Sequence, residues 1–294
     1  MTAVTWDHVG KHTATPVSAD FAGTFRLLRL YARRDRVVLP LWVLALGLSV
    51  GPVYVGSVND LYSTQQQLDT YAHSIASSPG LIAMYGPMLG TSLGAVSLWK
   101  AGFQFTIIAI AAVLTVIRHT RVEEETGRAE LVGATRIGRF ASLTAALLLT
   151  GLGSVLVGLL SFASIASQPV PAAGAAAFGA AMAASGLLWA GVGAVAAQVA
   201  STARIARQLA LGVLGIAFVL RAVGDVGSGT LSWLSPLGWC QQIRPFAQER
   251  WWVLAPLVVA ATAATAAAYV LLRGRDVGAG LIADRAGPAN ASAT

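Results

Sequence analysis

Charged residues and cysteine are scarce in this chain of 294 residues. Asp, Glu, Lys and Arg together make up 11% of the sequence, whereas soluble domains carry about 25%. With a single cysteine, Cys240, the chain can form neither an internal disulfide nor a cysteine-based metal site. The four histidines show no ligand spacing. The sequence therefore predicts no metal site and no catalytic residue.

Lysine is also scarce, and a nucleotide-binding loop is missing. The only lysines are Lys11 and Lys100, and neither lies in a G-x-x-x-x-G-K-S/T motif. Because that loop holds the phosphates of ATP in P-loop proteins, the chain is not expected to hydrolyse ATP. We predict a protein that is not an enzyme and binds no cofactor directly.

Hydrophobic residues are abundant and occur in long runs. Hydrophobic residues make up 55% of the chain, and the mean hydropathy is +0.66. Runs of about 20 apolar residues match a bilayer core, so an all-α polytopic membrane protein with six spans is predicted. The expected spans are about 37–58, 99–117, 140–165, 173–199, 209–223 and 253–272. They form a transmembrane domain (37–272) between a cytoplasmic tail with an interfacial helix (1–36) and a cytoplasmic tail or linker (273–294).

The distribution of basic residues predicts the orientation. Sixteen of the 20 Lys and Arg residues fall on one set of loops and four on the other. Cytoplasmic loops carry such an excess, so both termini are placed in the cytoplasm, with the protein in the cell membrane. The same arginines explain a pI of about 10.2, which in a soluble protein would suggest nucleic acid. The expected partner is the lipid bilayer, not nucleic acid.

Residues 21–36 are predicted to form an amphipathic helix at the cytoplasmic interface. Phe25, Leu28 and Tyr31 make an apolar stripe at helical spacing. The basic residues suited to anionic head groups are Arg26, Arg29, Arg33 and Arg34. Two interpretations stay open: a plain membrane anchor, or a helix that also contacts a cytoplasmic partner.

The loop from 118 to 139 is the most charged part of the chain. It is too long and too charged for a simple turn, and Glu124 and Arg128 are spaced i,i+4, as in a favourable helical pair. We predict a docking surface there, and its residues are Glu123, Glu124, Glu125, Arg128, Glu130 and Leu131. The alternative is a merely solvated loop.

The segment from 220 to 252, on the predicted outer side, combines charge with Trp, Pro and Gly. Arg221 and Asp225 are spaced i,i+4, so each can neutralise the other near lipid. The helix-breaking and interfacial residues that follow include Trp233, Pro236, Trp239, Arg244 and Pro245. Irregular backbone at membrane depth has to be shielded by protein or face water. We expect a half-inserted hairpin that either lines an exit route or caps the bundle.

Polar residues and glycines also occur within the spans. Lys100 and Gln104 fall on one helical face of the second span and are candidates for a transport pathway. The alternative for Lys100 is a side chain that reaches to the nearby interface. The fourth span contains a series of glycines that allow close helix packing in lipid, namely Gly174, Gly179, Gly186, Gly191 and Gly193. We predict packing rather than a substrate site for them.

Several of these features together resemble type-2 ABC exporter permeases. They are the interfacial helix, the Glu-Glu-Glu-x-Gly-Arg-x-Glu-Leu loop (123–131), the Arg-Ala-Val-Gly-Asp turn (221–225) and the Trp-Leu-Ser-Pro-Leu-Gly-Trp…Arg-Pro-Phe…Arg-Trp-Trp stretch (233–252). The chain looks most like the actinobacterial polyketide-antibiotic and multidrug (tetronasin-type) exporters, from about residue 20 to 285.

The resemblance implies an export permease for amphipathic drugs or antibiotics. The loop at 123–131 would be a coupling helix in a groove of a separate ATPase subunit, present in two copies that hold ATP and Mg²⁺. The helix around 26–36 would be the connecting helix, which approaches the same subunit. The hairpin around 236–245 would be the outer re-entrant element.

Members of this group usually contain two fused six-span halves, and the chain resembles the first half. A second half is therefore expected as an identical copy, a separate chain or a missing continuation. Two alternatives of another class remain, a non-transporting membrane anchor or regulatory subunit and a secondary carrier. The carrier is disfavoured because the spans lack the paired buried acids that relay protons in many pumps.

Overall fold

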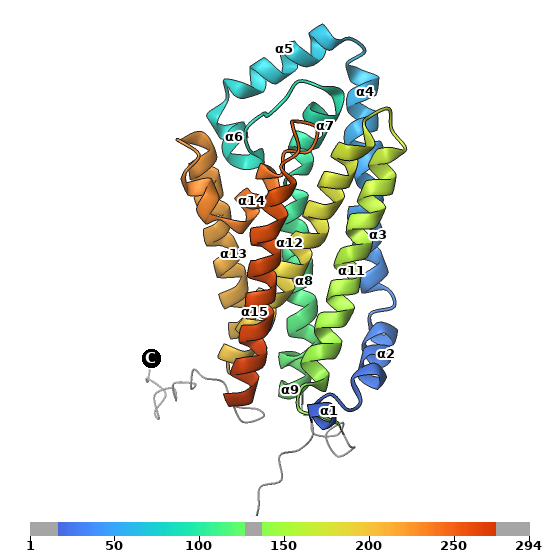
Figure 1. The fold of residues 1–294 in the computed structure, drawn as a ribbon, viewed down its shortest axis with the longest axis vertical. Helices are drawn as coiled ribbons and strands as arrows, with labels where there is room; N and C mark the ends of the chain where they lie inside the picture. Colours follow the sequence, from blue (N-terminus) through green and yellow to red (C-terminus); the bar gives the residue numbers. More distant parts are fainter. Residues whose placement is uncertain (1–16, 127–136, 275–294) are drawn as a thin grey trace, which may run out of the picture.

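The computed structural model describes residues 17–126 and 137–274 (Figure 1). Every regular element in these two ranges is helical. Six stretches are long and apolar enough to cross a membrane: Val38–Leu61, Leu93–Glu125, Ala141–Ala166, Ala172–Val199, Ala203–Val226 and Trp251–Gly274. The prediction of an all-α membrane protein with six spans is confirmed.

The six spans are joined by shorter helices. In chain order the described elements are α1 (Val17–Asp20), α2 (Thr24–Arg34), α3 (Val38–Ser49), a π-helical stretch (Val50–Gly56), α4 (Ser57–Leu61), α5 (Gln65–Ala76), α6 (Pro79–Tyr85), α7 (Leu93–Ala101), α8 (Gln104–His119), α9 (Arg121–Glu125), α11 (Ala141–Ala166), α12 (Ala172–Val199), α13 (Ala203–Val226), a 3₁₀ turn (Leu231–Leu234), α14 (Pro236–Gln242), a second 3₁₀ turn (Trp251–Val253) and α15 (Leu254–Gly274). We call the two ends of the bundle the α2 end, at the bottom of Figure 1, and the α5 end, at the top.

Two spans begin earlier than the apolar pattern predicted. The second starts at Leu93 rather than near 99, because the Ser92 hydroxyl accepts a backbone hydrogen bond (3.3 Å) from the first turn of α7. The fifth starts at Ala203 rather than near 209, because Thr202 caps α13 in the same way (3.2 Å). Residues 203–208, which lie between the expected fourth and fifth spans, are therefore the first turns of α13. These turns contain Arg204 and Arg207, so hydropathy, which marks the part of a helix that lies in lipid, misses them.

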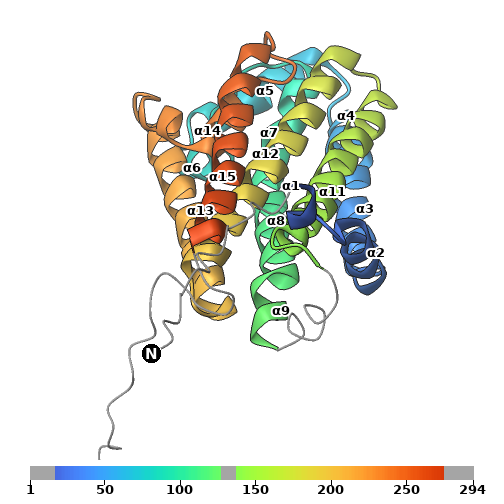
Figure 2. The same ribbon diagram turned by 60° about the horizontal axis from the view of Figure 1, so that its bottom comes forward.

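α12 is the central helix of the bundle. It packs against α8, α11, α13 and α15 (Figure 2). Within its membrane window 72% of the residues are buried, against 17% for the last span. The other helices therefore depend on the surface that α12 offers them.

Glycines allow these helices to approach α12 closely. A Cβ on Gly158 of α11 would lie 2.5 Å from the carbonyl oxygen of Gly179 of α12, and the reverse is also true. At Gly193 an added Cβ would meet the Val113 backbone of α8 at 3.1 Å, and at Gly191 it would meet Ala264 of α15 at 3.0 Å. The prediction that the glycines of the fourth span serve packing is confirmed at these positions.

Two helices, α5 and α6, cover the α5 end of the bundle, in the stretch between the first two predicted spans. α5 runs obliquely across that end, over α7 (Figure 1). Thr64 and Gln67 form a capping box that starts α5. Leu68 and Ala72 form its buried side, against Val96 of α7. An apolar face of this small size supports a helix only when α7 is already in place.

A methyl group at the contact between α11 and α12 should destabilise the bundle. We expect Gly158→Ala to lower the free energy of unfolding by about 1–3 kcal/mol, because overpacking forces the helices apart. Thermal unfolding of the purified protein in detergent measures the effect. Gly215→Ala is the matched control, since a Cβ there would meet no atom within 4 Å. Equal unfolding temperatures for the two variants would contradict the packing argument.

Candidate functional site

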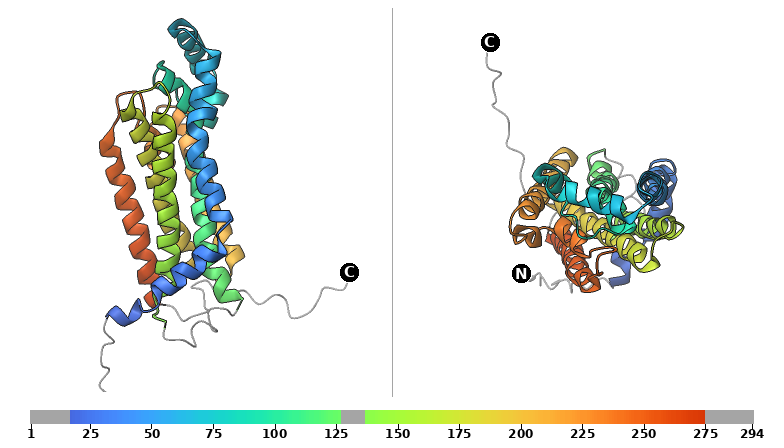
Figure 3. Two further views of the ribbon diagram at one scale, coloured as in Figure 1. Left: turned by 90° about the vertical axis from the view of Figure 1, so that its right-hand side faces the viewer. Right: turned by 90° about the horizontal axis from the view of Figure 1, so that it is seen from above.

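α2 packs on α11 and lies at an angle to the spans (Figure 3). Of the predicted apolar stripe, Tyr31 is buried within the protein and Leu28 is half-buried, whereas Phe25 is 81% exposed. Leu27, which was not predicted, is buried against α11 instead. The spacing identified an amphipathic helix, whereas the side that is buried depends on the position of α11.

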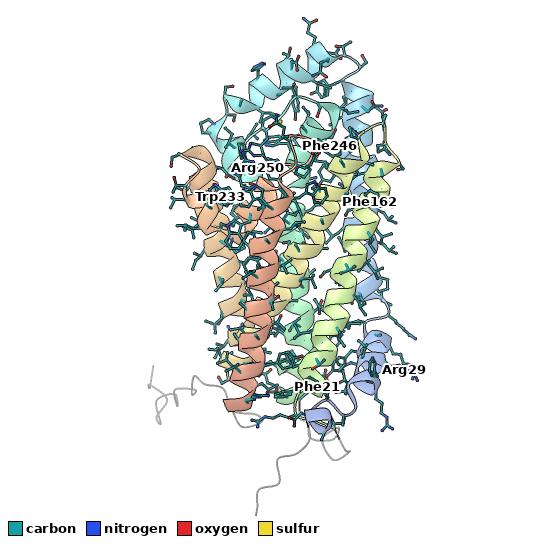
Figure 4. The ribbon with its side chains drawn as sticks, viewed as in Figure 1. Phe21, Arg29, Phe162, Trp233, Phe246 and Arg250 are labelled. Carbon is teal, nitrogen blue, oxygen red and sulfur yellow. The ribbon has the colours of Figure 1, made fainter. Side chains whose placement is uncertain are left out.

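The arginines of α2 divide into two groups. Arg26, Arg29 and Arg33 are exposed, and Figure 4 shows Arg29 projecting away from the bundle. The half-buried Arg34 points toward the protein, where its guanidinium pairs with the carboxylate of Glu123 in α9. The first group is a free basic surface, and Arg34 joins α2 to the predicted docking loop.

Asp35, directly after α2, forms a buried ion-pair site. It is 1% exposed, and its carboxylate lies 2.6 Å from Nε2 of His119 and 3.0 Å from Nη1 of Arg118. The His119 ring stacks on Tyr31 with ring centroids 4.4 Å apart. Burial raises the pKa of Tyr31, so its hydroxyl stays protonated beside Ser142 (3.0 Å). The end of α2 is therefore fixed to both α8 and α11.

α9 is joined in turn to the start of α13. Arg121 is 1% exposed, pairs with Glu124 at 2.5 Å and donates to the carbonyl oxygen of Ala200. The carboxylate of Glu125 accepts a hydrogen bond from the N–H of Ala203 (2.5 Å). A carboxylate at a helix N-terminus is stabilised by the free N–H groups and the helix dipole. α9 therefore holds the first turn of α13.

These interactions form one charge cluster that connects α2, α8, α9 and α13. Its members are Arg34, Asp35, Arg118, His119, Arg121, Glu123, Glu124 and Glu125. The predicted residues Arg128, Glu130 and Leu131 lie outside the described residues. Buried charges are tolerated when they are paired. A relative movement of these helices would therefore either keep the ion pairs together or have to break them.

Removing the buried carboxylate should destabilise the α2 end. We expect Asp35→Asn to lower the free energy of unfolding by about 1–3 kcal/mol, because Arg118 and His119 lose a charged partner in a dry site. The exposed Asp60 provides the control variant Asp60→Asn. Thermal unfolding in detergent checks the prediction, and an unchanged Asp35→Asn protein would exclude a structural role for the cluster.

Arg221 organises the opposite end of α13. The expected i,i+4 pair forms, with Arg221 Nη1 3.1 Å from the Asp225 carboxylate. The other guanidinium nitrogen donates to the carbonyl oxygens of Ala83 (2.9 Å) and Met84 (3.0 Å) in α6. The guanidinium also lies 4.6 Å from the ring centre of Phe218. One buried arginine therefore connects α13 to the helical cover at the α5 end.

The residues between α13 and α15, 227–250, form the hairpin segment. Ser232 donates to Asp225 (2.5 Å), and Ser235 donates to the carbonyl oxygen of Ala217 (2.7 Å), so the segment folds back along α13. α14 begins at Pro236, a position where the missing N–H costs nothing. Trp239 Nε1 donates a hydrogen bond to the Trp233 carbonyl oxygen (2.6 Å). The Trp233 ring stacks on that of Trp252, with ring centroids 5.6 Å apart.

The end of the hairpin segment has an unusual backbone. Arg244, Phe246 and Gln248 have φ angles of 55°, 63° and 61°, a region that L-residues rarely adopt. The Phe246 ring is held between Gly94 and Gly174, where an added Cβ would come within 2.5 Å and 2.4 Å of it. Figure 4 shows Phe246 and Arg250 close to this end of the bundle. Strained backbone of this kind persists only where the surroundings fix it.

A small cavity lies beneath this strained loop. It has a volume of about 60 Å³, and its wall includes Tyr85, Trp99, Phe105, Phe178, Gln241, Arg244 and Pro245. Burial and the neighbouring Arg250 lower the pKa of Arg244. The hairpin segment therefore covers this end of the bundle and borders a small cavity, and the choice between an exit route and a cap stays a prediction.

Lys100 and Gln104 lie in different surroundings within the span Leu93–Glu125. α7 ends at Ala101 and α8 begins at Gln104, and Gly102 and Phe103 between them keep right-handed helical backbone angles. Lys100 is exposed, whereas Gln104 is 3% exposed and donates to the Ser49 hydroxyl (3.3 Å). The pathway role of this pair stays a prediction.

The architecture agrees with a known family of transport proteins. The profile of the family described as multidrug efflux system permease Rv1217c, C-terminal domain, matches residues 26–273, which include the charge cluster and the hairpin segment. The chain belongs to this permease family. The multidrug efflux system permease protein Rv1217c of Mycobacterium tuberculosis (strain ATCC 25618 / H37Rv) is 52% identical over 280 residues, 95% of this chain and 51% of that protein. The chain spans about half the length of the curated relative that it matches.

Membership supports the resemblance to exporter permeases at the level of the family. The narrower assignment to a tetronasin-type group stays a prediction. The family description names a C-terminal domain, so it gives no support to the placement of this permease chain as a first half.

Several residues that carry interactions in these segments were not selected from the sequence: Asp35, His119, Arg121, Ser232 and Phe246. Asp35 had one usable signal, since it is the single acid within the run Arg33–Arg36. Arg121 had another, since its partner Glu124 lies three residues further on. His119 and Phe246 gave no signal, because their contacts come from distant parts of the chain.

Loss of Arg221 should release α6. We expect Arg221→Met to speed amide hydrogen exchange in 79–86 about tenfold, because each hydrogen bond from a charged donor contributes about 1.5–3 kcal/mol. Arg207→Met changes an exposed arginine on the same helix and is the control. Hydrogen–deuterium exchange with mass spectrometry measures both. Unchanged exchange in α6 would show that Arg221 does not hold it.

Proposed function

We propose that this chain is one membrane-spanning half of an ATP-driven multidrug efflux transporter. Support comes from the relative of 52% identity, whose name describes a multidrug efflux system permease, and from the six spans. The chain would lie in the cell membrane with the α2 end in the cytoplasm, as the excess of basic residues indicates. Amphipathic drugs or antibiotics are the substrate class.

The charge cluster is the observation that carries the coupling part of the proposal. It joins α2 and α9, two short helices at the α2 end, to the start of α13. A separate ATPase subunit, in two copies, would bind the surface that α2 and α9 form. ATP and Mg²⁺ belong to that subunit. Movement of α9 would then be transmitted directly to α13.

α13 would carry this movement to the other membrane surface. Only 28% of the residues in its membrane window are buried, so few contacts oppose its tilting. Its far end holds α6 through Arg221 and the hairpin segment through Ser235. A tilt of α13 would therefore displace α6 and the hairpin segment, including its strained end, together. ATP binding would open this end, and hydrolysis would restore the closed arrangement.

A second six-span half would complete the pathway. The relative is about twice as long as this chain, which leaves room for a half of similar size. The three sources remain an identical copy, a separate chain and a continuation of the same chain. Purification from native membranes with identification of the associated chains distinguishes them.

Reversal of one ion pair tests the coupling. We expect Arg34→Glu and Glu123→Arg each to reduce ATP-driven efflux from membrane vesicles about tenfold, a typical coupling of 1–3 kcal/mol. The double variant, which restores the pair with reversed charges, should recover most of the activity. Arg36→Glu alters an exposed neighbour and is the control. ATPase co-purification is measured in parallel.

Three outcomes would overturn the proposal. Full activity of both single variants would remove the coupling role of the cluster. Efflux that needs a proton gradient but no ATP would indicate a secondary carrier. An ATPase that associates with the chain while no substrate moves would indicate an anchor or regulatory subunit.

A further inference from the structure

A long apolar groove runs along the lipid-facing side of α11, α12 and α15. Its volume is about 560 Å³. α11 and α15 form the walls and α12 forms the floor, since α12 packs against both (Figure 1). Leu148 and Leu152 line one wall, Val258 the other, and Leu187 the floor. All four are large apolar residues that stay more than one-third exposed.

The groove is lined mainly by apolar side chains, and its polar residues are Thr144, Thr262, Thr265 and Tyr269. The Thr144 hydroxyl donates to the Phe140 carbonyl oxygen (2.7 Å) and lies 2.8 Å from the Tyr269 hydroxyl. The Thr262 hydroxyl donates to the Val258 carbonyl oxygen (2.8 Å). Hydroxyl groups that are satisfied within the protein leave a surface suited to hydrocarbon.

The length of the groove corresponds to one leaflet. On α11 it extends from Thr144 to Val155, about 16 Å at a helical rise of 1.5 Å per residue. Half of a bilayer core of about 30 Å is nearly the same. Thr144 lies one turn from the start of α11 at Ala141, so the groove belongs to the leaflet at the α2 end.

A cation and an aromatic cluster mark the mouth of the groove. One turn beyond Thr144 and Tyr269 lie Phe140 and Arg273, with the guanidinium carbon 5.5 Å from the Phe140 ring centre. Phe21 and Tyr269 pack on the same ring at 5.4 Å and 5.5 Å, and Figure 4 shows Phe21 at this end. Aromatic rings favour the level of the head groups, and an exposed arginine there attracts anionic lipid.

We infer that an anionic phospholipid binds here, with an acyl chain in the groove and its phosphate at Arg273. The apolar lining of the groove favours a hydrocarbon chain, and its length matches one leaflet of the bilayer. The positive charge of Arg273 at its end favours an anionic head group. The bound lipid would fill the gap between α11 and α15 and support a last span that is otherwise little buried. The inference requires neither transport nor an ATPase.

Photolabelling in vesicles tests the site. Phosphatidylglycerol with a diazirine in its acyl chain is compared with phosphatidylcholine that carries the same chain, using the full chain, and labelled peptides are identified by mass spectrometry. We expect labels on α11 and α15, with about fivefold preference for phosphatidylglycerol, the factor given by about 1 kcal/mol for one basic residue.

Two pairs of variants separate the parts of the inference. Thr262→Trp fills the groove and should abolish its labelling, whereas Ala263→Trp, exposed on the same helix but outside the groove, should not. Arg273→Gln should remove the preference for phosphatidylglycerol, whereas Arg207→Gln on α13 should keep it.

Three results would overturn the inference. Equal labelling of every exposed helix would show only the general lipid surroundings. Groove labelling that Thr262→Trp leaves unchanged would place the lipid elsewhere. A groove that is labelled in the isolated chain but not in the assembled transporter would be occupied by a helix of a partner.

Discussion

Water is missing from the hydrocarbon core of a membrane, so every backbone polar group and every buried charge needs a partner within the protein. Helices satisfy the backbone in the described spans, and the glycine contact between Gly158 and Gly179 lets them stand close together. Among the described residues, the buried charges lie near the two ends of the bundle and are paired there. Asp35 lies between His119 and Arg118, and Arg221 binds Asp225. The same requirement therefore shapes the packing of the bundle and the position of both sites.

The two sites are connected by one helix. α13 is held by Glu125 at its start and carries Arg221 near its end. Its 24 residues span about 36 Å at a helical rise of 1.5 Å per residue, enough to cross the bilayer core. α12 is fixed among four neighbours, whereas α13 has much less of its membrane window buried. In the proposed efflux cycle, α12 would therefore stay in place while α13 tilts.

The opposite face of the bundle has another character. Between α11 and α15 the protein leaves an apolar groove with the exposed Arg273 at one mouth. A bound lipid there would stabilise the α11–α12–α15 side, so movement would be concentrated at α13. In this view the lipid contributes to the division between the fixed and the moving part of the permease.

The sequence by itself determined the helical class, the six spans and the local pair Arg221–Asp225. These depend on composition and on neighbours one helical turn apart, so a linear pattern contains them. Only the tertiary structure decided that Asp35 meets His119, and that Leu27 packs on α11 while Phe25 stays exposed. Both depend on how distant segments pack. Burial and ion pairing act between residues far apart in the chain, and in this permease they define the candidate sites.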